Sequence, residues 1–291
     1  MATKKSVGYE IISLSNIKGI VEAFEEIAAV RITRTQDAVL RSRQFASEIN
    51  DIFQDIKSSS KRDITIIMKQ KKVADLKKLS FLSKNGKTLF VYLSANTGLY
   101  GNIVRRTFDL FTRYVGEFAD NVLIVGKVGL KLARDNGITK PVAYFDFPDS
   151  KVDEEQLQKI ASYMIQFERV VVFYGAVESI LRQKETMLDI SGNPEPSHEQ
   201  QEKVETKYFL EPDVNKILAF FEKEIFASIF EQAVREFQLA KLSSRVVGLN
   251  STIDNIDLEL KKTIIKKERL KHEEANRKQL QTFSSMSLWN T

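Results

Sequence analysis

One short glycine-containing segment has the residue types of a phosphate-binding loop. Ser94–Gly101 (SANTGLYG) follows a β-rich apolar run and precedes a helical pattern, the position of a nucleotide phosphate in a doubly wound α/β fold. The segment lacks the full GxGxxG spacing, no acidic residue is clearly placed for a ribose, and the chain has no P-loop lysine. Since such short motifs arise often by chance, we expect its glycines to serve tight turns, and we predict no cofactor bound by this chain.

Residues for metal binding or catalysis are sparse elsewhere. The chain has two histidines, His198 and His272, and no cysteine, so disulfides, thiolate chemistry and a Cys/His zinc site are not expected. The carboxylates mostly alternate with lysines on helical segments, as on solvated faces, and there is no credible Ser/His/Asp set. We therefore predict no metal site and no catalytic residue.

The charge balance permits an anionic partner without requiring one. Lysine and arginine number 44 against 39 acidic residues, a net charge of +5. The segment Lys261–Lys278 is rich in both signs, and Glu268, Glu273 and Glu274 dilute its positive field. We expect a solvated helix or a contact with an acidic protein surface, and no nucleic acid. The alternative, a nucleic-acid-binding coiled coil, would show itself by salt-sensitive DNA binding.

No membrane-spanning or signal segment is expected. The longest apolar runs, near Thr88–Leu93 and Val170–Val177, are far too short to cross a bilayer, and Met1–Glu10 has no apolar signal core. We expect an intracellular soluble chain or a peripheral subunit.

The last third of the chain, from Pro212 to about Met286, predicts one very long helix. After Pro212 there is no proline, and the only glycine is Gly248. A helix of about 75 residues would span roughly 110 Å and needs a partner along its length. Its apolar residues step by threes and fours, the spacing of a coiled-coil seam; the seam is Leu239, Leu242, Val246, Leu249, Ile253, Ile256, Leu260 and Ile264.

A second long helix is expected from about Leu14 to about Ile56, with Ser13 and Ser15 as candidate N-caps. The predicted seam is Ile17, Ile20, Phe24 and Ile27, followed with a small shift by Ile32, Thr35, Val39, Ser42, Phe45, Ile49, Ile52 and Ile56. The simplest way to bury both seams is an antiparallel pair in which the C-terminal helix outruns its partner.

Strand and helix patterns alternate between the two long helices, which favours an inserted, Rossmann-like α/β domain with a parallel-rich sheet. Strands are expected at Ile64–Met68, Thr88–Leu93, Asn121–Gly126, Val142–Phe145, Arg169–Tyr174, Thr186–Ile190 and Val204–Leu210, and helices at about Ile103–Phe118, Val128–Asn136 and Glu154–Phe167. The expected domains are an N-terminal coiled-coil helix (1–58), an inserted α/β foot domain (59–211) and a C-terminal coiled-coil helix (212–291).

This architecture resembles the gamma subunit, the central shaft, of rotary F-type ATP synthases. Four local motifs occur in the family's order: Glu25–Asp37 resembles "MEMVAAxKxRxxQ", Leu93–Gly101 resembles "SDRGLCG", Tyr208–Asp213 resembles "YxxEPD", and Ser251–Asn255 resembles "ATDNA". Together they span nearly the whole chain.

The resemblance implies a non-catalytic shaft inside a ring of alpha/beta-type nucleotide-binding subunits, which hold ATP or ADP and magnesium. It places the shaft contacts near Ala28, Ala29, Arg31, Lys271 and His272. It implies that the foot, with Gly98, Leu99 and Gly101, meets an epsilon-type subunit and the membrane rotor ring. The chain would then be a peripheral part of a multisubunit complex on the cytoplasmic side of a membrane.

Departures from the family pattern leave alternatives open. Asn96-Thr97 replaces the family's Asp-Arg, Glu22 replaces a usual lysine, and Lys271-His272 aligns with the Arg-Gln of its "NKARQ" stretch. These changes favour, as an alternative, a gamma-like shaft of a divergent ATPase that is not coupled to protons and drives export or motility. Another class is a nucleotide-binding α/β enzyme with a coiled-coil arm, against which the incomplete glycine loop argues.

Overall fold

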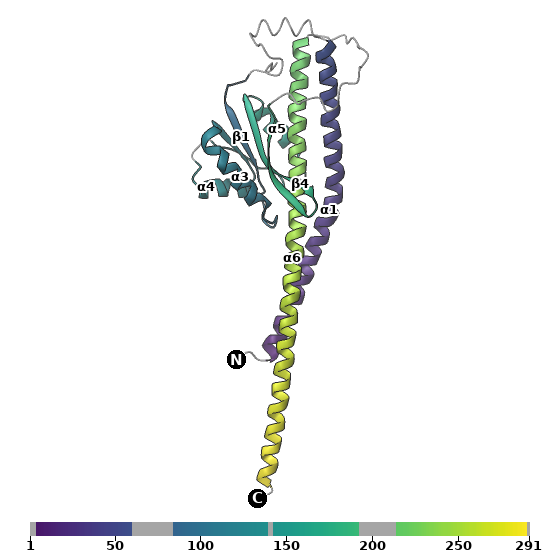
Figure 1. Ribbon diagram of the computed structural model, residues 1–291, viewed down its shortest axis with the longest axis vertical. Helices are drawn as coiled ribbons and strands as arrows, with labels where there is room; N and C mark the ends of the chain where they lie inside the picture. The colour runs from purple at the N-terminus through teal and green to yellow at the C-terminus, as the bar shows by residue number, and fades with distance from the viewer. Residues whose placement is uncertain (1–3, 60–83, 139–141, 192–213, 290–291) are drawn as a thin grey trace. The chain divides into compact units, whose positions relative to one another are not determined.

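The computed structural model describes residues 4–59, 84–138, 142–191 and 214–289 (Figure 1). Two helices, α1 (Lys4–Ser59) and α6 (Val214–Trp289), flank an α/β insert. The chain divides into two compact units, one formed by residues 1–30 and 245–291 and the other by residues 31–244. Both long helices contribute residues to both units, and each unit is described by itself.

The first unit is an antiparallel helix pair. Lys18 Nζ of α1 lies 2.6 Å from Asp257 Oδ1 of α6, whereas the earlier residue Lys5 shares a groove with the later residue Glu274. Residues at three- and four-residue steps are shielded on both helices, among them Val7 and Ala28 on α1 and Ile256 on α6. The predicted pairing of the two terminal helices is thus confirmed.

The predicted start and part of the predicted seam of α1 are wrong. The helix begins at Lys4 rather than near Leu14, so Ser13 and Ser15 lie inside it and cannot be N-caps. Ile17, Ile20, Phe24 and Ile27 are 46–58% exposed. The residues that are half-buried or buried in this stretch are Leu14, Lys18, Val21, Glu22, Glu25 and Ala28. The stretch carries two heptad-spaced stripes, and periodicity alone does not say which of them faces the partner helix.

Three smaller seam assignments also change. Ile264 of α6 is exposed and Thr263 is buried in its place. On α1, Phe45 and Ile52 are about half exposed, and the neighbouring Phe53 is buried instead. The remaining positions of the predicted α6 seam, from Leu239 to Leu260, are buried or half-buried as expected.

The second unit contains a five-stranded sheet with the order β3-β2-β1-β4-β5. Its strands are β1 (Thr88–Leu93), β2 (Asn121–Val125), β3 (Val142–Phe145), β4 (Arg169–Ser179) and β5 (Arg182–Asp189). Strands β1 to β4 pair in parallel and β5 is antiparallel to β4. After their first residues, Thr88 and Asn121, strands β1 and β2 consist of buried apolar or aromatic residues, as expected when both faces of a parallel sheet are covered.

Helices α3 (Ile103–Phe118), α4 (Lys127–Asp135) and α5 (Glu154–Met164) connect the parallel strands. Aromatic rings of α3 pack on the sheet. The ring centroid of Phe111 lies 5.4 Å from that of Tyr92 and 5.5 Å from that of Phe173. The α6 residues Phe226, Phe230, Ala233, Val234 and Phe237 belong to the same core, so this part of α6 packs on the insert.

The α/β insert and its parallel-rich sheet are confirmed, with boundaries that shift by a few residues. β4 extends five residues beyond the predicted Tyr174, and β5 begins at Arg182 rather than Thr186. The expected strands Ile64–Met68 and Val204–Leu210 and the helix start at Pro212 lie outside the described residues. The domain junctions near residues 58 and 211 adjoin such segments, so the three-domain division stays a prediction. No helix in the described part of the chain has the length and apolarity needed to cross a bilayer.

Candidate functional site

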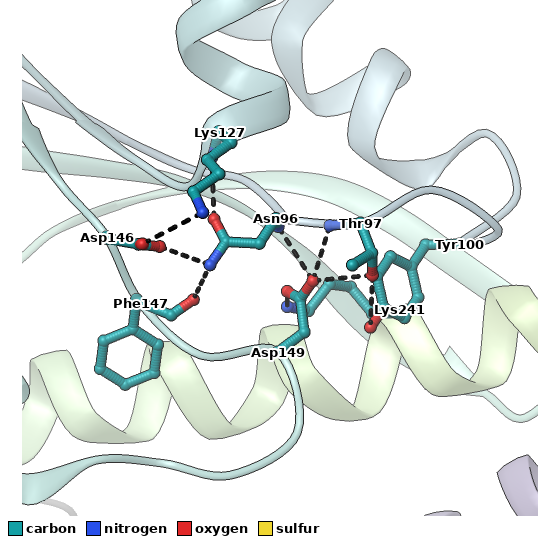
Figure 2. Close-up of polar contacts among 8 residues, drawn as sticks. All are labelled: Asn96, Thr97, Tyr100, Lys127, Asp146, Phe147, Asp149 and Lys241. Carbon is teal, nitrogen blue, oxygen red and sulfur yellow. Dashed lines mark hydrogen bonds and ion pairs between the residues drawn. The ribbon is translucent and has the colours of Figure 1, made fainter.

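The loop that follows β1 is held by the side chain of Asn96, which joins three segments (Figure 2). Asn96 Nδ2 donates to Asp146 Oδ1 and, over 2.9 Å, to the carbonyl oxygen of Phe147. Asn96 Oδ1 accepts from the backbone N–H of Lys127 at 2.9 Å, at the first residue of α4. This amide side chain therefore fastens the end of β1 to the start of α4 and to the segment after β3.

Asp149 connects the same loop to α6 (Figure 2). Its Oδ2 accepts from the backbone N–H groups of Asn96 and Thr97, each at 2.9 Å, and from Thr97 Oγ1 at 3.0 Å. Its Oδ1 pairs with Lys241 Nζ at 2.6 Å, and the two side chains are only 9% and 7% exposed. Lys241 Nζ also lies 5.2 Å from the Tyr100 ring centroid and 5.0 Å from that of Phe237.

The charge state of Asp149 follows from these contacts. Burial by itself would raise the pKa of the Asp149 carboxyl, but the Lys241 ammonium and the hydrogen bonds from Lys241 and Thr97 outweigh it and lower the pKa below its ordinary value. Asp149 is therefore ionised at neutral pH.

This arrangement argues against a phosphate-binding loop. A phosphate site presents successive backbone N–H groups to an anion, and here the N–H groups of Asn96 and Thr97 are directed at a carboxylate of the chain itself. The chain's own anion thus fills the position that a nucleotide phosphate would use. The geometry favours the structural role expected of this loop over nucleotide binding.

The turn that follows is tight and close to α6. Gly101 has φ +58°, and a Cβ built there would lie 2.4 Å from Ser244 Oγ and 2.9 Å from the Ser244 carbonyl oxygen. Leu99 has φ 65° and is 71% exposed, although a left-handed conformation costs a leucine about 1 kcal/mol or more. Gly98 has open space around its Cβ position. The loop therefore holds an apolar side chain in solvent on a strained, well-anchored turn.

The residues expected to contact partners on the shaft have different environments. Ala28 is buried in the seam of the first unit, whereas Ala29, Arg31, Lys271 and His272 are exposed. Lys271 Nζ lies 3.4 Å from the carboxylate of its helical neighbour Glu268, and both side chains are more than half exposed. Ala28 thus lets the two helices approach each other, and the other four are available to a partner.

An apolar outer face of α1 was not recognised as such from the sequence. We define it as Tyr9, Ile12, Ile17, Ile20, Phe24 and Ile27, which are 46–63% exposed. The signal was present, because four of these residues were assigned to the inner seam. Contiguous apolar surface of this kind marks an interaction site on a soluble protein.

The seam of the same unit contains polar residues. Lys18 pairs with Asp257 inside it, Thr263 is buried, and Glu25, Lys267 and Glu274 are half-buried at further seam positions. Polar residues at such positions lower the stability of a coiled coil. This helix pair therefore has a weak interior and an apolar exterior, an arrangement that favours a surrounding partner.

Comparison with known proteins identifies relatives along almost the whole chain. The family model described as ATP synthase matches residues 3–274. The ATP synthase gamma chain of Halothermothrix orenii is 22% identical over 267 residues, covering 88% of each chain. The gamma chain of Geotalea daltonii is 21% identical over 280 residues, covering 89% of this chain and 91% of its own.

A solved structure shares the fold. A chain in the central stalk/c-ring structure of the Tetrahymena thermophila mitochondrial ATP synthase superposes with a TM-score of 0.57 and 16% identity, covering 80% of this chain and 99% of that one. The fold derived above is thus the fold of a central-stalk chain.

Proposed function

This chain belongs to the ATP synthase family, with gamma chains as its relatives, and we propose that it works as the central shaft of an F-type rotary ATPase. As a gamma-type subunit it is not catalytic. ATP, ADP and magnesium would be bound by a surrounding ring of alpha/beta-type subunits, and the shaft would couple ATP synthesis or hydrolysis in that ring to rotation.

The proposed mechanism is a coupling of free energies. A shaft with different faces pushes each surrounding site into a different conformation, and those conformations differ in their affinity for nucleotide. Binding or hydrolysis at one site then favours one orientation of the shaft, and shaft orientation changes nucleotide affinity in return. The chain contributes shape and stiffness, and no chemical group.

The observation that carries the proposal is the outer face of α1. Its six large apolar side chains are about half exposed, and burying one such side chain contributes about 1 kcal/mol or more. The first unit leaves about half of each of these side chains uncovered, so their full burial requires another protein. A ring that encloses the helix pair meets this requirement.

The contact residues follow from the same proposal. Ala29, Arg31, Lys271 and His272 would lie on the gripped part of the shaft, with Ala28 setting the spacing of the two helices behind them. Gly98, Leu99 and Gly101 would present the foot to an epsilon-type subunit and the membrane rotor ring. The complex would be peripheral, on the cytoplasmic side of a membrane, and would not bind nucleic acid.

The test is a charge placed on the outer face. Ile20→Glu together with Phe24→Glu should leave the unfolding of the isolated chain almost unchanged, because both side chains are already half in water. The variant should fail to co-purify with nucleotide-binding ATPase subunits, or should assemble without coupled turnover. Ile180→Glu together with Leu181→Glu, exposed between β4 and β5 on the insert, is the matched control for charge and should leave co-purification with those subunits intact. Normal assembly and coupling of the double variant would contradict the proposal.

The alternative is a shaft in an ATPase complex that does not transport protons, and it is distinguished by which other proteins co-purify with this chain. It is favoured by Asn96-Thr97, which replaces the family's Asp-Arg and organises the foot loop through Asp146 and Asp149. A complex that contains a proteolipid rotor ring would support proton transport. A complex with the ATPase ring and no rotor ring would support a shaft that drives another output.

A further inference from the structure

One buried carboxylate in the second unit contacts three separate elements. Glu236 of α6 is 7% exposed. Its Oε1 accepts from Arg43 of α1, with Nε at 2.8 Å and Nη2 at 2.6 Å, and from Gln232 Nε2 at 3.1 Å. Its Oε2 accepts from the hydroxyl of Tyr174 on β4 at 3.1 Å. One carboxylate group therefore joins both long helices and the sheet.

We infer that Glu236 is a mechanical joint, through which load passes between the inserted sheet and the pair of long helices. The inference rests on the proposed shaft function, because only a chain under torque needs such a joint. It assigns Glu236, Arg43 and Tyr174 a positioning role, since none of them would touch nucleotide.

The physical reason lies in the direction of the forces. Apolar packing between α6 and the insert is non-directional, so it resists separation but opposes sliding less. Hydrogen bonds weaken steeply when their angles change, and those to an ionised group are about twice as strong as neutral ones. The Glu236 contacts therefore oppose shear between α1, α6 and β4.

The protonation states suit this role. Burial raises the pKa of Tyr174, and the negative charge of Glu236 raises it further, so the phenol keeps its proton and donates it to Oε2 at all physiological pH values. The hydrogen bond from Tyr174 to Glu236 therefore does not open with ordinary changes of pH.

A first test uses the isolated full-length chain. If Glu236 links Arg43 mechanically to Tyr174, the stability effects of Arg43→Met and Tyr174→Phe must be non-additive. Removing either partner leaves the Glu236 carboxylate less constrained and so weakens its contact with the other partner. Each should lower the Tm by a few degrees, and the double variant should lower it by less than the sum. Strictly additive shifts, in the wild type and in Glu236→Gln alike, would overturn the joint.

A matched control lies one turn away on the same helix. Glu231 pairs with Arg235 at 2.6 Å within α6, so Glu231→Gln removes an ion pair that joins no second element. This variant should show no coupling with Tyr174→Phe, whereas Glu236→Gln should abolish the coupling between Arg43 and Tyr174.

The second test measures stiffness in the assembled complex. The chain contains no cysteine, so Lys131→Cys, on the exposed side of α4, gives a unique site for a bead whose angular fluctuations are recorded while the ring is fixed. Glu236→Gln should raise the angular variance about twofold, since the charge that strengthens the contacts to α1 and β4 is lost, and Glu231→Gln should leave it unchanged.

The two hypotheses fail differently. If the wild-type chain does not rotate in an ATPase ring, the shaft function fails, and the coupling measured in the isolated chain decides whether the joint exists. If the wild type rotates and Glu236→Gln has wild-type variance, the shaft stands and the joint is overturned.

Discussion

At the scale of single residues, Asn96 explains why an amide stands where the resembled family has an acid. Its Nδ2 donates to the Asp146 carboxylate and to the Phe147 carbonyl oxygen. An aspartate would place a second negative oxygen against both acceptors. We therefore expect Asn96→Asp to lower the free energy of unfolding by about 1–3 kcal/mol, measured by urea denaturation.

The control for Asn96→Asp is the same change in the same loop. Asn102 is the N-cap of α3 and makes no side-chain capping bond, so a negative charge there meets the positive end of the helix dipole. Asn102→Asp should be neutral or stabilising by up to about 1 kcal/mol. Equal losses in the two variants would mean that charge in the loop, and not the Asn96 contacts, is responsible.

The ion pair of Asp149 predicts an acid-sensitive contribution to stability. Its pKa in the folded chain is below the ordinary 3.8, so the pair stabilises the fold above the unfolded pKa, and this stabilisation is lost as the pH falls through the lowered folded value. Asp149→Asn should be less stable than the wild type at neutral pH, and it should lose less stability as the pH is lowered through the Asp149 pKa. The measurement is the urea midpoint of both proteins at a series of acidic pH values. Equal decreases of the midpoint with pH in the two proteins would contradict the prediction.

At the scale of elements, the turn after β1 depends on one glycine and not on its neighbour. Gly101→Ala puts a Cβ into Ser244 and keeps a residue at φ +58°, which costs about 1–3 kcal/mol for the backbone alone. Gly98→Ala meets nothing within 4 Å and should be neutral or stabilising by about 0.4–1 kcal/mol. Thermal unfolding distinguishes them, and similar Tm values for both variants would refute the close approach of the turn to α6.

The sequence predicted the elements better than their faces. Apolar runs such as Val170–Phe173 and the amphipathic segment Ile103–Phe118 identify a strand and a helix through local periodicity, which the fold preserves. The face of α1 was assigned wrongly because Ile20 and Phe24 have the spacing of a seam. The true inner residues include Lys18, whose partner Asp257 is 239 positions away and invisible to a local pattern.

The candidate site was predictable only in part. The glycine turn was expected, since Gly98 and Gly101 stand between a strand and a helix. The contacts that hold it were not, because Asn96 and Asp149 are 53 positions apart and Asp149 and Lys241 are 92 apart. Ion pairs at such separations depend on topology, which only the folded sheet and α6 supply.

At the scale of the whole chain, the contacts divide by purpose. In the described part of the second unit the buried charges Glu236 and Lys241 have ion-pair partners, and the pair of Lys241 with Asp149 fastens the insert to α6. In the first unit six large apolar side chains remain about half exposed on the outer face of α1. A protein that acted alone would be expected to bury these apolar side chains in preference to charged ones. This distribution is what a shaft requires: internal fastening for load, and an exterior completed by other subunits.

The last part of α6 should matter for coupling and not for folding. Residues 275–284 are exposed throughout, including Leu280 and Phe283, and Lys271 is 61% exposed with a 3.4 Å contact to Glu268. Replacing residues 271–273 by alanine, or deleting the chain from Met286 onward, should therefore change the free energy of unfolding by no more than about 1 kcal/mol. In the assembled complex both changes should weaken the coupling of ATP turnover to rotation, because they remove the charges and the tip that the ring would grip.

Lys131→Ala with Arg134→Ala, exposed on α4, removes basic residues away from the shaft and should leave coupling intact. Unchanged assembly and turnover in both shaft variants would place the gripped surface elsewhere on the chain.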